Sequence, residues 1–217
     1  MEQKSLTELH ELIPAGYYER SIKKNPFQRF WHFQRFKNVS QLVERAKGDI
    51  LDIGCADGTF TKIIFDKAKP RKIIGIDIVK SSIDYARKKF RKNKKMNFLV
   101  ADGLNLPFDK NSFEAVFALE VVEHCPFPKK LLSEAKRVLK PGGYLIVLVP
   151  TDNFLFKILW RIVLKTWGKH WRHTHVQSFD KKNSVSLIIK KTGFKIEQDK
   201  KFLLGMLEVV KARKVVK

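Results

Sequence analysis

The feature that most limits the fold of this chain is an alternation of short apolar runs with helical patterns from residue 50 onward. The apolar runs lie at 49–54, 72–77, 97–102, 114–119 and 143–149. Residues 58–68, 80–93 and 127–139, which lie between them, have the periodicity of helices. Runs of Ile, Val and Leu that alternate with helices are typical of a parallel sheet covered on both faces. We therefore predict an α/β fold.

The two ends of the chain extend this pattern. Residues 1–47 predict two helices with breakers near Pro14, Gly16 and Pro26, and a further helix is expected near 180–191. The last apolar segments, from Phe194 onward, predict two strands joined by a short turn, an antiparallel hairpin that finishes the sheet. We expect one structural domain, with an N-terminal helical segment at 1–47 followed by the main α/β unit at 48–217.

The charge of the chain is strongly positive, with 44 Lys plus Arg against 22 Asp plus Glu and a net charge of +22. Such an excess indicates nucleic acid, a membrane surface or an anionic substrate, or else only a solvated surface. The cations are 33 Lys and 11 Arg, and this bias favours solvation, because recognition of phosphate favours Arg. The two cysteines make no disulfide framework, and we find no signal peptide and no apolar stretch of about 20 residues. We expect a cytoplasmic protein, at most peripheral to a membrane.

The segment LDIGCADGTFTK at 51–62 is the sharpest local motif. Small residues at Gly54, Ala56 and Gly58 let the backbone bend tightly after a strand, and the following helix offers its N–H groups to a ligand. The dinucleotide fingerprint requires a glycine where this chain has Thr59, which disfavours a nicotinamide or flavin cofactor.

Acidic residues stand at the ends of three successive predicted strands, at Asp52, Asp77 and Asp102. A carboxylate after the second strand can accept hydrogen bonds from both hydroxyls of a ribose, and one after the third strand can accept from an exocyclic amine. A single such acid is ordinary helix capping. Three acids at one edge of the sheet indicate a nucleotide site.

With these motifs the chain resembles the class I S-adenosylmethionine-dependent methyltransferases, in particular the type 11 methyltransferase-domain family and its ubiquinone- and menaquinone-pathway members. LDIGCADG, IIGID, VADGLNLPF, FEAVFALEVVEHC and SEAKRVLKPGGYLIVLVP are similar to successive motifs of that family. The resemblance implies a Rossmann-like sheet of seven strands, mostly parallel, with an antiparallel last strand. It also implies S-adenosylmethionine as cofactor, bound by Asp52, Gly54, Ala56, Gly58, Asp77, Ile78, Asp102, Gly103 and Leu119. Ala56 and Glu114 depart from the usual Gly and Asp of the family.

The residues after the fourth predicted strand supply candidates for the chemistry. Glu120, His124 and the later His175 are the catalytic candidates, because a base near an oxygen or nitrogen acceptor can take up its proton. Glu120, Glu123, His124 and His175 together resemble a divalent-metal site of two branches of the superfamily. In many methyltransferases a similar motif holds no metal, so both interpretations stay open.

Two segments mix aromatic and basic residues, 154–171 and 27–36. In 154–171 the cations recur every four residues beside a broad apolar face, a pattern typical of an interfacial helix. By resemblance such helices form a lid over the pocket. Three interpretations of these segments stay open: a lid packed on its own core, peripheral docking on an anionic membrane, and RNA binding. Nucleic acid is disfavoured by the scarcity of Arg and by the lack of a recognisable RNA-binding module.

The sequence thus predicts a methyltransferase whose acceptor is a small hydrophobic molecule of lipid or quinone type. Two alternatives remain: an RNA 2′-O-methyltransferase, and an inactive cofactor-binding subunit whose lid helices dock a partner. The oligomeric state and the methylated atom are left open.

Overall fold

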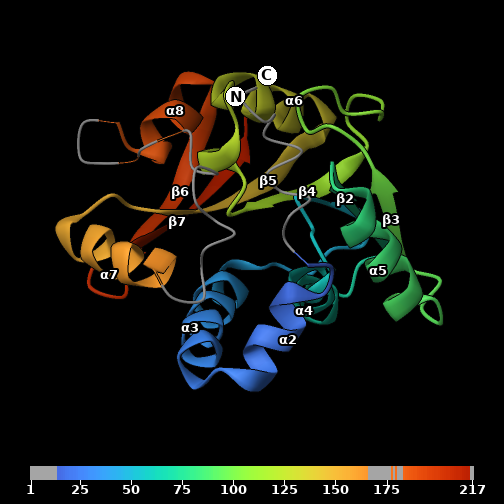
Figure 1. The fold of residues 1–217 in the computed structure, drawn as a ribbon. Coiled ribbons are helices and arrows are strands. Elements are labelled where there is room, and N and C mark those ends of the chain that lie inside the picture. The colour runs from blue at the N-terminus through green and yellow to red at the C-terminus, as the bar shows by residue number, and fades with distance from the viewer. Residues whose placement is uncertain (1–13, 166–176, 178, 180–182, 216–217) are drawn as a thin grey trace, which may run out of the picture.

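A single sheet of seven strands forms the centre of the molecule (Figure 1). The structure is a computed structural model that describes residues 14–165, 177, 179 and 183–215. The strands are β1 (Asp49–Ile53), β2 (Lys72–Asp77), β3 (Met96–Val100), β4 (Phe113–Leu119), β5 (Leu139–Pro150), β6 (Phe194–Phe202) and β7 (Leu207–Lys214). They lie in the order β3-β2-β1-β4-β5-β7-β6.

The sheet is parallel except at one strand. The pairs from β3 to β5 are parallel, whereas β7 runs antiparallel to both of its neighbours, β5 and β6. This confirms the predicted mostly parallel sheet and its terminal hairpin. The chain places β2 and β3 on one side of β1 and β4 on the other, so the connections change direction between β1 and β4. In open α/β sheets, ligands bind in the crevice at such a switch point, beyond the carboxyl ends of the strands.

Helices cover both faces of the sheet (Figure 1). The helices of one face are α6 (Pro128–Val138) and α8 (Val185–Lys191), and those of the other are α3 (Pro26–Leu42), α4 (Thr59–Ala68) and α5 (Lys80–Phe90). Successive side chains of a strand point to opposite faces. Accordingly, Leu51 and Ile53 of β1 join the core beneath α6, while Ile50 joins the core beneath α3 and α4.

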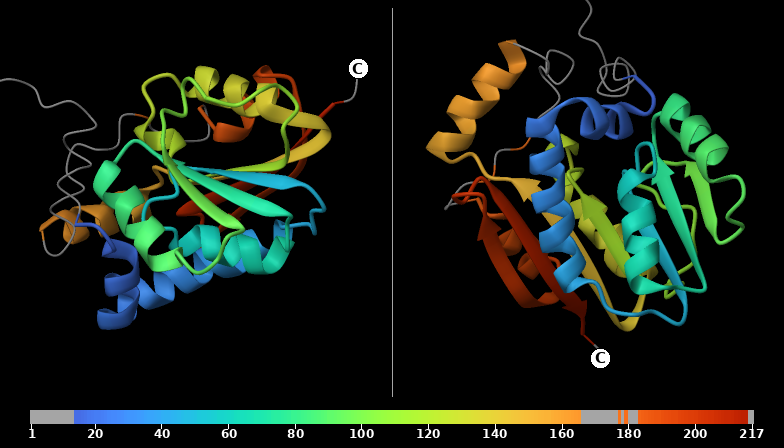
Figure 2. Two further views of the ribbon diagram at one scale, coloured as in Figure 1. Left: turned by 90° about the vertical axis from the view of Figure 1, so that its right-hand side faces the viewer. Right: turned by 90° about the horizontal axis from the view of Figure 1, so that it is seen from below.

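Two helices lie beyond the carboxyl ends of the strands, α2 (Tyr17–Lys24) and α7 (Phe154–Lys165) (Figure 2). The carboxyl group of Glu44, just after α3, accepts hydrogen bonds from Lys211 and Arg213 of β7 and so fixes the N-terminal helices to the sheet. A short 3-10 helix, η1 (Val122–His124), follows β4. None of the described helices is long and apolar enough to cross a membrane.

Candidate functional site

A cavity of about 460 Å³ lies at the switch point, and we call it the sheet-edge cavity. Residues after β1, β2, β3 and β4 form its walls, and the start of α2 closes one side. Six of the nine predicted cofactor contacts line it, namely Gly54, Ala56, Asp77, Ile78, Asp102 and Gly103. The structure therefore brings together residues that are up to 49 positions apart in the sequence.

The backbone after β1 bends sharply to form one wall of the cavity. Gly54, Ala56 and Gly58 all have positive φ, at 71°, 45° and 75°. Gly54 also leaves no room for a side chain, because a Cβ there would lie 2.1 Å from Val121 Cγ2. The bend is fixed to β2, since the N–H groups of Gly54 and Cys55 donate to the carbonyl of Ile76 at 2.7 and 2.9 Å.

Asp77 is held at the cavity wall by backbone N–H groups. Its carboxylate accepts one hydrogen bond from the N–H of Ala56 at 3.0 Å and one from the N–H of Val79 at 2.9 Å. Burial raises the pKa of Asp77, and these backbone N–H groups oppose the rise. Each carboxylate oxygen has a second acceptor position, so Asp77 can still receive two ligand hydroxyls. The carboxylate of Asp102 accepts from Leu104 N–H at 2.8 Å, and this side chain is exposed at the cavity.

Three of the predicted contacts lie behind the wall rather than on it: Asp52, Gly58 and Leu119. Asp52 faces the α4 side of the sheet, where its carboxylate accepts a hydrogen bond from Thr61 Oγ1 at 2.6 Å. Burial raises the pKa of Asp52 to about 7, although the hydrogen bond from Thr61 lowers it in part. In this structure Asp52 supports the bend of the backbone and does not line the cavity.

Several residues that were not among the predicted cofactor contacts line the cavity as well. Asp57 is 2% exposed and accepts from the N–H of Thr59 at 3.0 Å and from the N–H of Glu19 at 3.1 Å. It thereby joins the start of α4 to α2. Tyr17 and Tyr18 of α2 close the cavity on the side of the N-terminal helices. Only contacts between distant segments reveal these roles.

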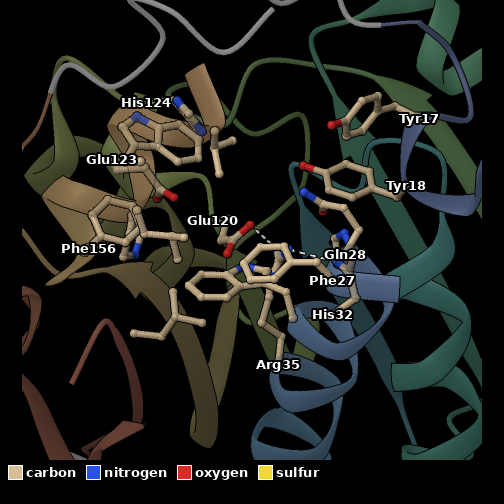
Figure 3. A pocket seen from close by; sticks show the side chains of 16 residues that line it. Tyr17, Tyr18, Phe27, Gln28, His32, Arg35, Glu120, Glu123, His124 and Phe156 are labelled. Carbon is tan, nitrogen blue, oxygen red and sulfur yellow. Dashed lines mark hydrogen bonds and ion pairs between the residues drawn. The ribbon is translucent and has the colours of Figure 1, made fainter. Parts of the chain in front are cut away.

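A second, smaller pocket of about 80 Å³ adjoins the sheet-edge cavity, and we call it the helix pocket (Figure 3). Helices α2, α3 and α7, the residues after β4, the end of β5 and the start of β7 form its walls. Six of its sixteen lining residues carry large aromatic rings, namely Tyr17, Tyr18, Phe27, Trp31, Phe156 and Trp160. Tyr17, Tyr18, Glu120 and His124 line both spaces, so these four residues stand at the boundary between them.

Buried polar groups lie among these aromatic rings. Arg35 of α3 is 3% exposed and forms an ion pair with Glu120, and its Nη1 donates to His32 Nδ1 at 3.0 Å. Burial and, to a smaller extent, the charge of Arg35 lower the pKa of His32 to about 2, so this imidazole is neutral. Burial raises the pKa of Glu120 against the opposing effect of Arg35, and burial together with the charge of Glu120 raises the pKa of Glu123. Glu120 has φ of 56°, a strained conformation that aims its side chain from the end of β4.

Three of the four candidates for the metal site that the sequence left open, Glu120, Glu123 and His124, lie in the described part of the chain. No three His, Cys, Asp or Glu side chains in the described part of the chain form a cluster that could hold an ion. Glu120 instead pairs with the guanidinium of Arg35, a cation that competes with a metal for the same carboxylate. His175 lies outside the described residues, whereas Glu123 and His124 line the helix pocket.

Residues 51–147 match the family described as "Methyltransferase domain". The demethylmenaquinone methyltransferase of Bacteroides fragilis is 27% identical over 198 residues, which cover 83% of this chain and 81% of the relative. A phthiotriol/phenolphthiotriol dimycocerosates methyltransferase of Mycobacterium tuberculosis is 30% identical over 114 residues, 52% of this chain and 42% of that protein. The solved geranyl diphosphate C-methyltransferase of Streptomyces coelicolor, in complex with S-adenosyl-L-homocysteine, is similar with a TM-score of 0.69 at 15% identity. That similarity covers 92% of this chain and 86% of the other.

The open sheet, the bend after β1 and the cavity at the switch point define a nucleotide-binding α/β enzyme. The acids and backbone N–H groups of the cavity suit the ribose and the amino group of S-adenosylmethionine. The apolar walls of the cavity are formed by Ile78, Leu104 and Leu131. The chain carries a methyltransferase domain at residues 51–147, and over most of its length it is similar to S-adenosylmethionine-dependent methyltransferases.

Proposed function

We propose that this methyltransferase acts on a small hydrophobic acceptor of quinone or lipid type, bound in the helix pocket. The observation that supports this proposal is the aromatic lining of a pocket that shares four residues with the sheet-edge cavity. S-adenosylmethionine, when bound, supplies an electrophilic methyl group. The demethylmenaquinone and phthiotriol relatives are named for acceptors of these two kinds.

The protein's own residues contribute mainly by positioning. Rings of α2, α3 and α7 hold a flat or apolar acceptor and exclude water, and alignment of two reactants supplies much of a rate enhancement. Glu120 and His124 stand where the two spaces meet, and we assign them the removal of the acceptor's proton. His175 stays a catalytic candidate from the sequence.

The test is transfer of a tritiated methyl group from S-adenosylmethionine to separated lipid, RNA, protein and small-molecule fractions of a cell extract. We expect label in the lipid or the small-molecule fraction, and none with the Asp77→Ala variant. Label in RNA favours the RNA 2′-O-methyltransferase. No label in any fraction, with intact cofactor binding, favours the inactive subunit.

We also propose that α7 docks on an anionic membrane, from which such an acceptor can be taken. Phe154, Leu155 and Ile158 are 76%, 45% and 41% exposed, and Lys157 and Arg161 are exposed beside them. Leu204, 81% exposed, lies next to the helix, because Asn153 Nδ2 donates to its carbonyl at 3.1 Å. Apolar side chains flanked by cations match an interface of acyl chains and anionic headgroups.

Flotation with vesicles of phosphatidylglycerol and phosphatidylcholine tests this surface. We expect the protein to float at low salt, and the double variant Phe154→Ser, Leu204→Ser to float several-fold less. The matched control is Val100→Ser, because Val100 is 47% exposed on β3, at the far edge of the sheet. Equal flotation of both variants would refute docking through α7.

A further inference from the structure

The helix pocket contains three buried polar atoms that have no hydrogen-bond partner among the described residues. They are His32 Nε2, Arg35 Nε and Glu123 Oε2. Their side chains belong to residues that are only 2%, 3% and 1% exposed, and all three residues line the pocket. An unpaired buried polar group costs free energy, and in a native site it points to a partner that binds there.

The two residues of α3 offer hydrogen-bond donors. A guanidinium only donates, so the bond of 3.0 Å between Arg35 Nη1 and His32 Nδ1 makes Nδ1 the acceptor. The ring proton of His32 therefore sits on Nε2, which is a donor like Arg35 Nε. The unpaired oxygen of Glu123 lies on the other side of Glu120 and is the natural acceptor (Figure 3).

The charge of the pocket limits what can occupy it. Arg35 is already paired with Glu120, so its positive charge is balanced. An anionic group would bring an unmatched charge into a buried site, which is costly. A pure hydrocarbon would leave all three polar atoms unpaired.

We propose that His32, Arg35 and Glu123 bind the polar part of the acceptor, a neutral flat ring with a hydroxyl toward Glu123 and a second oxygen toward α3. This inference rests on the proposed function and narrows its acceptor to phenol- or quinol-like compounds. His32, Arg35 and Glu123 line the helix pocket but not the sheet-edge cavity, so they select the acceptor without binding the cofactor.

Two probes, 4-methoxy-1-naphthol and 1,4-dimethoxynaphthalene, differ only in whether one oxygen is a free hydroxyl or a methyl ether. Their dissociation constants are measured by equilibrium dialysis with protein saturated with S-adenosylhomocysteine. We expect the naphthol to bind at least about ten-fold more tightly, because leaving the buried oxygen of Glu123 without a hydrogen-bond partner costs about that much. Equal affinities, or no binding of either probe, would overturn the proposal.

Glu123→Leu keeps the size of the side chain and removes its oxygens, so the preference for the naphthol should disappear. The matched control is Glu208→Leu, because Glu208 is also 1% exposed and also has an unpaired oxygen, yet lines neither space. Its preference should stay at the wild-type value. A Glu123→Leu protein that still prefers the naphthol contradicts the assignment.

His32→Phe gives an independent answer if Glu123→Leu fails to fold. Phe keeps the ring packing against Tyr18 and Phe36 and removes Nε2–H, so both probes should bind several-fold more weakly with their ratio unchanged. Unchanged affinity for both probes contradicts the role of His32. Affinity for S-adenosylhomocysteine should be unaffected in both pocket variants, and its absence in the wild type would refute the methyltransferase function instead.

Discussion

The sheet-edge cavity and the helix pocket share four residues, but the chain builds them in different ways. The cavity is formed by loops that directly follow parallel strands, with positions set by backbone hydrogen bonds such as those from Gly54 and Cys55 to Ile76. The pocket is formed by helices that meet across the sheet edge, and its polar groups are held by side chains such as the Arg35–Glu120 pair. A fixed backbone suits a cofactor common to many enzymes, while side chains on helices can vary with the acceptor.

The largest effect is expected in the helix pocket, whose polar groups are held by side chains. Arg35→Met should lower the free energy of unfolding by about 3 kcal/mol, because it removes the cation that balances Glu120 in a buried site. Urea denaturation measures the loss. Arg71→Met is the matched control, since it breaks the pair with Asp49, in which Arg71 is 71% exposed, and it should have a much smaller effect. Losses of equal size would contradict the special role of Arg35.

The next largest effect is expected in the sheet-edge cavity, whose loops are fixed by backbone hydrogen bonds. Asp77→Ala should weaken the binding of S-adenosylhomocysteine about 100-fold, because it removes two charged acceptors for the ribose and two partners of the loop. Isothermal titration calorimetry measures the affinity. Asp109→Ala removes an exposed acid that does not line the cavity and should leave the affinity unchanged. An unchanged affinity in Asp77→Ala would refute the ribose assignment.

A smaller effect concerns the support behind the cavity wall. The pKa of Asp52 is raised from 3.8 to about 7 by burial, so between about pH 4 and 7 the folded state binds a proton that the unfolded state has lost. Stability should therefore fall as pH rises through this window, with a slope of at most about 1.4 kcal/mol per pH unit.

Asp52→Asn removes this titration but keeps an acceptor for Thr61. The difference in unfolding free energy between wild type and variant, measured by urea denaturation from pH 4.5 to 7.5, should move in favour of the variant. A difference that does not change with pH would show that Asp52 is ionised in the folded protein.

The smallest effect is expected in the backbone of the bend. Ala56 has φ of 45°, a left-handed conformation that costs an L-residue about 1–2 kcal/mol. Ala56→Gly relieves this strain, but the greater entropy of glycine in the unfolded chain offsets part of the gain. The net rise in the free energy of unfolding should be up to about 1 kcal/mol. Ala86→Gly, in the middle of α5, should lower it. Two changes of the same sign would contradict the strain at Ala56.

The two regions also differ in how far the sequence predicts them. Four of the five predicted strand runs, and the bend at Gly54–Gly58, agree with the structure within two residues, because apolar runs and small residues act over a few positions. The exception is β5, which begins at Leu139, four residues before its predicted start. The orientation of Asp52 follows from strand alternation as well, since Leu51 and Ile53 face the opposite core. The Arg35–Glu120 pair joins residues 85 positions apart, and no local pattern specifies which acid a helix cation will meet.

The late position of β7 in the chain bears on how the enzyme is made. Glu44 pairs with Lys211 and Arg213, which the ribosome adds 167 and 169 residues later. Until then the partner strand of β5 is missing, and the apolar side of α3 lacks part of the surface it covers. Contacts that are distant in sequence form slowly, and the unpaired edge of β5 is open to aggregation meanwhile. The N-terminal helices are therefore among the first elements to be synthesised and among the last to be fixed in place.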